Sequence, residues 1–389
     1  MKKNIENIDN RIGCIKYIEE LEQYDIPPDN FFATDVNEYE YFSDSRICGI
    51  FSFGKKYPIT FRMITGEENE YGYYRYILRI PTIINPLIYN KVTPEKYYKK
   101  VQENFDKARK DGYYFKEGLA GEFICIFAVF LRARFYLRSV VNRNNQEISQ
   151  KITYPVFLPS TVSEYKEIFN DKKKNLTSDL IPFFEKIVTL PDKGHFNIIH
   201  SFREYHEALK NIGIDHDIVY LKLVVAIEGI ASIEKVESNF KHDFPECFNL
   251  IKDDKEKLNQ ITTMWANRGS TNSVRSFLKK YLLGIRKDFE KTVYINKEGK
   301  NKNITLEKTI NRIYASRSKY VHEGRQMTIS KISFRDSAYE PTMGGVIDRK
   351  KILLDELLPV ISYFENIVNI SLINYIDINT LVKKLINKK

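Results

Sequence analysis

Hydrophobic and polar residues follow two different patterns along the chain. From about Phe31 to Ile84, short runs rich in Tyr, Phe and Ile are separated by turn residues such as Gly54-Lys55-Lys56, which is typical of β-strands. The runs are Arg46–Phe53, Ile59–Ile64 and Tyr71–Ile80. This part of the chain therefore predicts a small antiparallel sheet, and it contains no recognisable catalytic signature.

Helical spacing appears on both sides of this sheet. A short helix is predicted over residues 11–24, and another begins at Thr93-Pro94, a cap residue followed by a first-turn proline, and runs to about Lys110. Gly118–Leu137 is apolar enough to form a mostly buried helix. A polar stretch and a segment with two prolines follow, and we expect the domain boundary there, between residues 142 and 160.

The rest of the chain is predicted to be almost wholly helical. The expected helices are Val162–Phe169, Ile181–Val188, Ile198–Asn211, Ile218–Glu237, Leu250–Trp265, Asn272–Leu283, Ile304–Val321 and Lys351–Ile376, and Gly213 and Gly269 lie at plausible helix ends. The long polar connection from Val321 to Lys351 is typical of a functional loop. The predicted fold class is thus α+β. We expect residues 1–145 to form a small β-rich domain with helices, whose role, sensor or regulatory, the sequence does not identify, and residues 160–389 to form an all-helical bundle.

Composition and charge exclude few classes of function. The formal net charge of +10 favours polyanionic partners, above all nucleic acid, although the abundance of Ile, Asn, Lys and Tyr expected from an AT-rich genome produces the same excess. Four separate cysteines without a CxxC pair predict neither a zinc site nor disulfides, and they fit a reducing cytoplasm. The longest apolar run, Phe123–Leu131, is too short to cross a membrane, so a cytoplasmic protein is expected.

Several common kinds of site are missing from the sequence. It has no GxxxxGK[ST], no GxGxxG after a strand and no GxSxG, so P-loop hydrolysis, dinucleotide binding and α/β-hydrolase chemistry are not favoured. Five of the six histidines, including His195 and His200 near a helix start, show no spacing suited to a metal. We therefore expect no metal and no cofactor.

The sixth histidine, His322, closes a predicted amphipathic helix and follows Arg317 in the spacing R-x4-H. Five residues along a straight helix turn a side chain by about 500°, so the two side chains would point roughly 140° apart. They converge only if the helix ends between or just after them. Gly324 suits such an end, because glycine accepts a left-handed conformation, and the helix dipole favours an imidazolium in the last turn.

At this point the sequence resembles the HEPN superfamily, and within it the Apea-like branch, whose motif is often written RSxxVHxG and reads RSKYVHEG here. The helix Tyr220–Lys235, with Ile227-Glu228-Gly229-Ile230 in place of a leucine-containing "LE.L" core, and the closing helix LLDELLPVISYFENIVNISL are similar to helices of that family. The resemblance covers about residues 195–376 and leaves the N-terminal third unexplained.

The resemblance implies a metal-independent endoribonuclease that cleaves RNA by 2′-OH attack and acts as an anti-phage defence or toxin effector. His322 would be the general acid and base, and Arg317 would bind the phosphate. Ser318 would orient either group, and Lys319 and Arg325 would attract RNA through their positive charge. Glu228 would hold the guanidinium of Arg317 in place. HEPN relatives pair two such motifs across a two-fold axis, which implies a homodimer with a composite active site. A regulatory protein or a phage-derived trigger is a further expected partner.

Other readings of the same residues stay open. Arg317 can be a helix-end cation that complements the dipole, His322 a capping or core histidine, and Lys319 and Arg325 solvated charges. The main alternative function is a non-catalytic HEPN module that binds nucleotides, nucleic acid or a protein partner. A metal-dependent nuclease is a third class with weak support, because acidic pairs such as Asp253-Asp254 have the appearance of solvated charges.

Overall fold

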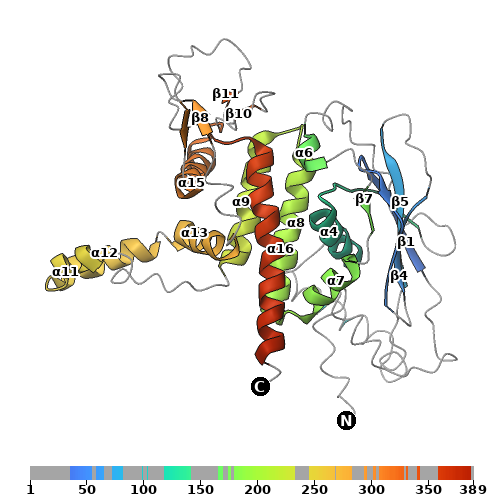
Figure 1. Cartoon of the computed structure of the whole chain (residues 1–389), viewed down its shortest axis with the longest axis horizontal. Coiled ribbons are helices and arrows are strands. Elements are labelled where there is room, and N and C mark those ends of the chain that lie inside the picture. Colours follow the sequence, from blue (N-terminus) through green and yellow to red (C-terminus); the bar gives the residue numbers. More distant parts are fainter. Residues whose placement is uncertain are drawn as a thin grey trace. The chain divides into compact units, whose positions relative to one another are not determined.

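The computed structural model describes residues 36–54, 58–64, 72–81, 99, 103, 118–141, 165–169, 174–176, 179–232, 245–267, 269–282, 293–295, 301–303, 306–327, 330–331, 340–341 and 358–386. The chain divides into two compact units, Met1–Pro191 and Asp192–Lys389. The first holds an antiparallel sheet and the second is mostly helical (Figure 1), so the predicted α+β class is confirmed. The helices predicted over residues 11–24 and from Thr93 to Lys110 fall outside the described residues, apart from Lys99 and Glu103.

The N-terminal unit is built on a five-stranded sheet in the order β3-β4-β5-β1-β6, and every neighbouring pair in it is antiparallel. The strands are β1 (Val36–Ser43), β3 (Ile50–Phe53), β4 (Ile59–Met63), β5 (Tyr74–Pro81) and β6 (Tyr136–Val141). A short β2 (Ile47–Cys48) pairs in parallel with β7 (Lys174–Asn175). Along β3, exposed and buried residues alternate, which gives the sheet one face suited to a core.

Aromatic side chains fill the core on that face. Helix α4 (Leu119–Leu131) lies against the sheet through Phe127, whose ring centroid is 4.6 Å from that of Phe61 and 5.1 Å from that of Phe51. Helix α7 (Leu180–Thr189) adds Phe184, with its ring centroid 4.9 Å from that of Phe51 and 5.0 Å from that of Phe123. This cluster joins α7 to the sheet.

An ion pair is buried in the same unit. Arg134, with a fully buried side chain, donates through Nε to Asp44 Oδ2 at 2.7 Å, and the guanidinium lies over the Phe169 ring at 4.4 Å from its centroid. Phe169 belongs to α6 (Lys166–Phe169), so the pair ties this short helix to the loop after β1.

Two predictions for this unit differ from the structure. The helix predicted over Gly118–Leu137 ends at Leu131, because Arg132 adopts a left-handed conformation (φ 48°), and Tyr136–Val141 pairs with β1 as a strand. The units meet at Pro191 and Asp192, later than the predicted boundary at 142–160, because α7 contributes Phe184 to the sheet's core.

In the C-terminal unit, α8 (Asp192–Asn211) and α9 (His216–Ala231) form a hairpin, and α16 (Ile361–Ile386) packs against both. Gly213 (φ 85°) lies in the turn between α8 and α9, as predicted, and the Asp215 carboxylate accepts hydrogen bonds from the backbone N–H groups of Asp217 and Ile218. Tyr205 on α8 donates to Glu365 on α16, and Tyr220 on α9 stacks on Phe364. These contacts form the core of the unit.

The remaining elements of this unit are α11 (Pro245–Ile251), α12 (Lys255–Asn267), α13 (Gly269–Tyr281), α15 (Leu306–Glu323), and the strand pairs β8 (Val293–Ile295) with β9 (Asn301–Asn303) and β10 (Ser330–Lys331) with β11 (Glu340–Pro341). The unit is thus mostly but not wholly helical, in contrast to the all-helical prediction. The predicted helix Leu250–Trp265 is two helices, and Gly269 begins α13 instead of ending a helix.

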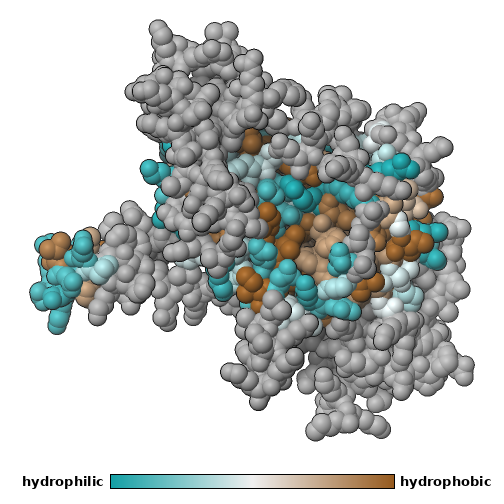
Figure 2. Space-filling view, in the orientation of Figure 1, coloured by the Kyte–Doolittle hydropathy of each residue, from teal (hydrophilic) through white to brown (hydrophobic). Residues whose placement is uncertain are grey.

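Hydrophobic as well as hydrophilic side chains reach the surface on the face drawn in Figure 2. In α11 no residue is buried, and Leu250 is 85% exposed. Among the described helices, none combines the length and the apolar composition that a membrane crossing requires.

Candidate functional site

Helix α15 carries the predicted Arg-His pair. Its apolar buried residues are Leu306, Ile310, Ile313 and Tyr314, which recur at helical spacing, and the helix packs against α9 and α13. Arg317 continues this face by one more turn and is half-buried. Packing of the apolar face therefore sets the rotation of the helix and the direction of each polar side chain in its last turn.

Gly324 ends α15 as the sequence predicts. Its φ is +65°, and its N–H donates to the carbonyl oxygen of Tyr320 at 3.1 Å. A glycine with positive φ whose N–H donates back into the last turn is a left-handed cap, which is found at many helix ends. An added Cβ would have no heavy atom within 4 Å, so glycine is needed here for its backbone conformation and not for space. The helix thus stops directly after His322 and Glu323.

Arg317 points toward α9 and meets Glu228. Arg317 Nη2 lies 3.6 Å from Glu228 Oε2, and the two side chains are 32% and 21% exposed. The sequence predicted this pairing, and the structure brings the two residues together. Within the described part of the chain, the buried Nε of Arg317 has no hydrogen-bond partner. The carboxylate therefore orients the guanidinium, but the N–H group at Nε of Arg317 still lacks an acceptor among the described residues.

Tyr314, one turn before Arg317, lies next to the same carboxylate. Burial raises the pKa of its hydroxyl well above the ordinary value, and the negative charge of Glu228 raises it further. The hydroxyl accordingly stays protonated beside the Glu228–Arg317 pair. No sequence pattern pointed to Tyr314, since an aromatic residue on the apolar face of a helix is ordinarily part of the core.

His322 is exposed in the last turn of α15. Because both residues lie inside the helix, the roughly 140° between their side-chain directions holds, and Arg317 and His322 do not share a face in one chain. His322 instead shares the solvent side of the helix with Ser318, four residues earlier, which is also exposed. The structure therefore separates the pair that the motif brings close in sequence.

The two flanking cations also lie at this end of α15. Lys319 is half-buried, and Arg325, directly after Gly324, is exposed. The N–H of Arg325 donates to the carbonyl oxygen of Lys319 at 3.3 Å, so backbone hydrogen bonding holds the two residues on either side of the helix end.

The segment after α15 is tied to the start of α9. The Met327 N–H donates to Asp217 Oδ1 at 3.2 Å, and burial raises the pKa of the Asp217 carboxyl, an effect that this hydrogen bond opposes. The helix end that carries His322 is therefore fixed at two points, by the cap at Gly324 and by the contact at Met327.

Within the described ranges, no three His, Cys, Asp or Glu side chains lie together in a way that could hold a metal ion. Asp253 and Asp254 lie at the break between α11 and α12, where the Asp254 carboxylate accepts from Lys257 and pairs with its ammonium at 3.0 Å. This capping and pairing accounts for Asp254 without a metal.

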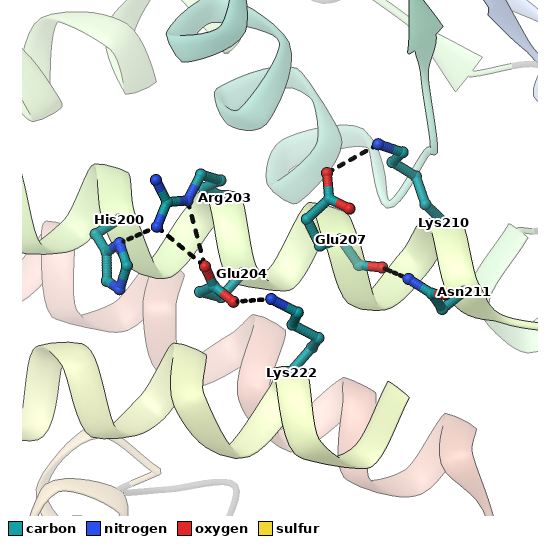
Figure 3. A network of polar contacts seen from close by, with 7 residues as sticks. All are labelled: His200, Arg203, Glu204, Glu207, Lys210, Asn211 and Lys222. Atoms are coloured by element: carbon teal, nitrogen blue, oxygen red, sulfur yellow. Dashed lines mark hydrogen bonds and ion pairs between the residues drawn. The ribbon is translucent and has the colours of Figure 1, made fainter. Parts of the chain in front are cut away.

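A second polar cluster lies between α8 and α9, and it is drawn in Figure 3. It contains His200, Arg203, Glu204 and Lys222, with Glu207, Lys210 and Asn211 further along α8. The sequence did not indicate this cluster: His200 was expected near a helix start, whereas in the structure it lies inside α8. The only available signal was the i, i+3 spacing of His200 and Arg203, a pattern that solvated helix faces share.

Comparison of the chain with protein-family models, with curated proteins and with solved structures gives no match. The resemblance to HEPN proteins therefore stays a prediction that depends on the residues of the motif.

Proposed function

We propose that the C-terminal unit is a metal-independent endoribonuclease of the HEPN type. The observation that supports this most is the end of α15: Gly324 stops the helix directly after the motif and leaves His322 exposed, while Glu228 holds Arg317 one to two turns earlier. An exposed imidazole and an oriented guanidinium are the two kinds of group that acid-base cleavage of a phosphodiester needs, although here they lie on different faces of α15.

The proposed reaction needs no metal. His322 removes the proton of a ribose 2′-OH, the 2′-oxygen attacks the adjacent phosphorus, and the bond to the 5′-oxygen breaks as that oxygen receives a proton from an imidazolium. The products are a 2′,3′-cyclic phosphate and a 5′-hydroxyl. Arg317 would stabilise the charge that builds on the phosphate oxygens, and Ser318 would orient the imidazole from the same helix face.

One chain holds only half of such a site. His322 faces solvent whereas Arg317 faces α9. The imidazole therefore needs a second acid-base group and a cation from another chain. A two-fold dimer in which the solvent faces of two α15 helices meet would supply a second His322 and a second Lys319. Arg317 would act after exchanging its Glu228 partner for phosphate, and Arg325 would help to attract RNA.

In this proposal the protein is a defence or toxin effector, and the N-terminal sheet unit senses a regulatory protein or phage-derived trigger. The alternative is a non-catalytic module that binds nucleic acid, nucleotides or a partner. The Arg317–Glu228 ion pair is the observation that favours it, because the carboxylate already occupies the guanidinium.

Cleavage of total RNA and of tRNA by the full chain in excess chelator separates these functions. We expect the wild-type chain to cleave and His322→Ala to leave the RNA intact while staying folded. Glu323→Ala, at an exposed position in the same helix turn, is the matched control and should cleave as the wild type does. Equal cleavage by His322→Ala would refute the proposal, and cleavage lost on adding chelator would favour a metal-dependent enzyme.

A further inference from the structure

The cluster between α8 and α9 gathers cations around one nearly buried carboxylate. Glu204, whose side chain is 8% exposed, accepts from Arg203 Nη2 at 3.1 Å through Oε1 and from Lys222 Nζ at 2.7 Å through Oε2. The side chains of Arg203 and Lys222 are 30% and 34% exposed. Glu204 therefore pairs with both cations, as Figure 3 shows, while about a third of each cationic side chain stays exposed.

The charge balance of this cluster is positive. Glu207 is engaged by Lys210, whose Nζ lies 2.8 Å from its Oε1. Among the residues drawn in Figure 3, the cations are Arg203, Lys210 and Lys222, and the carboxylates are Glu204 and Glu207. Within this drawn set the cations outnumber the carboxylates by one, and partly exposed cationic donors of this kind favour an anion.

His200 adds a neutral hydrogen-bond donor. Its Nδ1 lies 2.8 Å from Arg203 Nη2, and because a guanidinium has only N–H groups, Nδ1 must accept and the ring proton sits on Nε2. Burial lowers the pKa of His200, and the positive charge of Arg203 lowers it further. In the described part of the chain, no hydrogen bond from Nε2 is present, so this N–H can serve a ligand.

Gly229 allows the backbone of α9 to approach His200 and Ser201 closely. A Cβ at this position of α9 would lie 3.1 Å from Ser201 Oγ and 3.4 Å from His200 Cδ2. Ser201 Oγ is fully buried and has no hydrogen-bond partner among the described residues. The absence of a side chain at 229 thus keeps two polar groups of α8 next to the α9 backbone.

The cluster and the Arg317–Glu228 pair each include one residue of α9, Lys222 and Glu228, and these two residues lie on either side of the partly exposed stripe of that helix. Lys222 and Glu228 are six residues apart, which is about 9 Å along the axis, and helix geometry turns them about 120° from each other. A polyanionic strand that crosses this stripe could contact the cluster on one side and Arg317 on the other.

We propose that His200, Arg203 and Lys222 form a subsite for one backbone phosphate of a single-stranded nucleic acid that crosses α9. The two cations contact the phosphate oxygens, and His200 donates through Nε2. The identification of that strand as the substrate rests on the proposed ribonuclease function, but the phosphate contact itself does not. Glu204 competes with the phosphate for both cations.

Salt dependence of binding tests this subsite directly. Full-length His322→Ala protein is titrated with a labelled 20-nucleotide RNA and with its deoxy counterpart in chelator, and the observed binding constant is followed against salt concentration by fluorescence polarisation. Adding Arg203→Gln and Lys222→Gln should reduce the log–log salt slope by about 0.7, the contribution of one phosphate on a single strand. It should also weaken binding at low salt by about tenfold, as expected for the loss of a charge-assisted hydrogen bond.

Two further variants distinguish a phosphate contact from loss of structure. Lys257→Gln removes a lysine whose side chain is 70% exposed and paired with Asp254, and it should leave the salt slope unchanged. Glu204→Gln removes the competing carboxylate and should tighten binding, the opposite sign from damage to a structural network. An unchanged slope in the double variant, or weaker binding by Glu204→Gln, would overturn the proposal.

The outcomes for the two proposals can be separated. A deoxy strand has no 2′-OH and cannot be cleaved by the proposed reaction, so its binding reports the phosphate contact alone. A reduced slope with the deoxy strand, together with no His322-dependent cleavage of RNA, would leave the subsite standing and refute the ribonuclease. His322-dependent cleavage of RNA together with an unchanged salt slope would support the ribonuclease and refute the phosphate subsite.

Discussion

Gly324→Ala perturbs the end of α15 without creating a clash. Gly324 has a φ of +65°, and a Cβ there would meet no heavy atom within 4 Å. A left-handed conformation costs an L-residue roughly 1–2 kcal/mol, and alanine recovers about 0.4–1 kcal/mol by restricting the unfolded chain. The net loss of stability should therefore be about 1 kcal/mol, or roughly 2–4 °C in Tm for a unit of this size.

Urea unfolding followed by circular dichroism measures this loss. Gly324→Asn should lose less, because asparagine tolerates the left-handed region. Gly118→Ala in the other unit should lose more stability than Gly324→Ala: Gly118 also has a positive φ (56°) and open space around its Cβ position, but its ψ of −132° lies outside the left-handed region that L-residues tolerate. A Gly324→Ala protein as stable as the wild type, or one more stable than Gly324→Asn, would refute the account of this helix end. RNA cleavage should fall with Gly324→Ala, because His322 loses its fixed direction.

Two further variants test the fold and the α8–α9 cluster. Asp44→Asn should destabilise the protein by about 3–5 kcal/mol, because it leaves the fully buried Arg134 without its carboxylate, and an unchanged urea midpoint would contradict that. The pKa of His200 lies below its ordinary value, so the unfolded chain binds a proton there that the folded chain does not, and stability should fall as pH drops below about 6.5. His200→Gln should reduce this loss between pH 7 and pH 5 in urea titrations, and an equally steep loss in the variant would show that other groups cause it.

The strands of the N-terminal unit could be predicted because one face of the sheet is buried and the other is exposed. Alternation of apolar and polar residues was visible at Ile50–Phe53 and Ile59–Met63. The end of α4 was not visible, because apolar residues recur after it at Ala133, Phe135 and Leu137, and because the left-handed residue at the break is Arg132 and not glycine. The expected boundary at residues 142–160 differs from the division after Pro191, because α7 belongs to the first unit through the packing of Phe184 on Phe51. This contact joins residues far apart in the sequence, so no local pattern indicates it.

The candidate site was predicted unevenly. The helix stop at Gly324 followed from a local pattern, a glycine after a helix, whereas the Arg317–Glu228 pair was an expectation from the resemblance of Tyr220–Lys235 to a family helix. Arg317 and His322 are five residues apart, and this spacing puts their side chains on different faces of a continuous helix. The structure shows that α15 is continuous through both residues, so they are separated. The cluster around Glu204 was not predictable, because its members are charged residues on two helices whose pairing depends on how α8 packs on α9.

The chemistry of the RNA ends tests the central proposal most directly. A defined single-stranded RNA is incubated with the full chain in excess chelator, and the fragments are analysed by mass spectrometry. The account predicts 2′,3′-cyclic phosphate and 5′-hydroxyl ends with the wild type, no cleavage next to a 2′-deoxy position, and no products with His322→Ala. The same products from His322→Ala, or cleavage at the 2′-deoxy position, would contradict it.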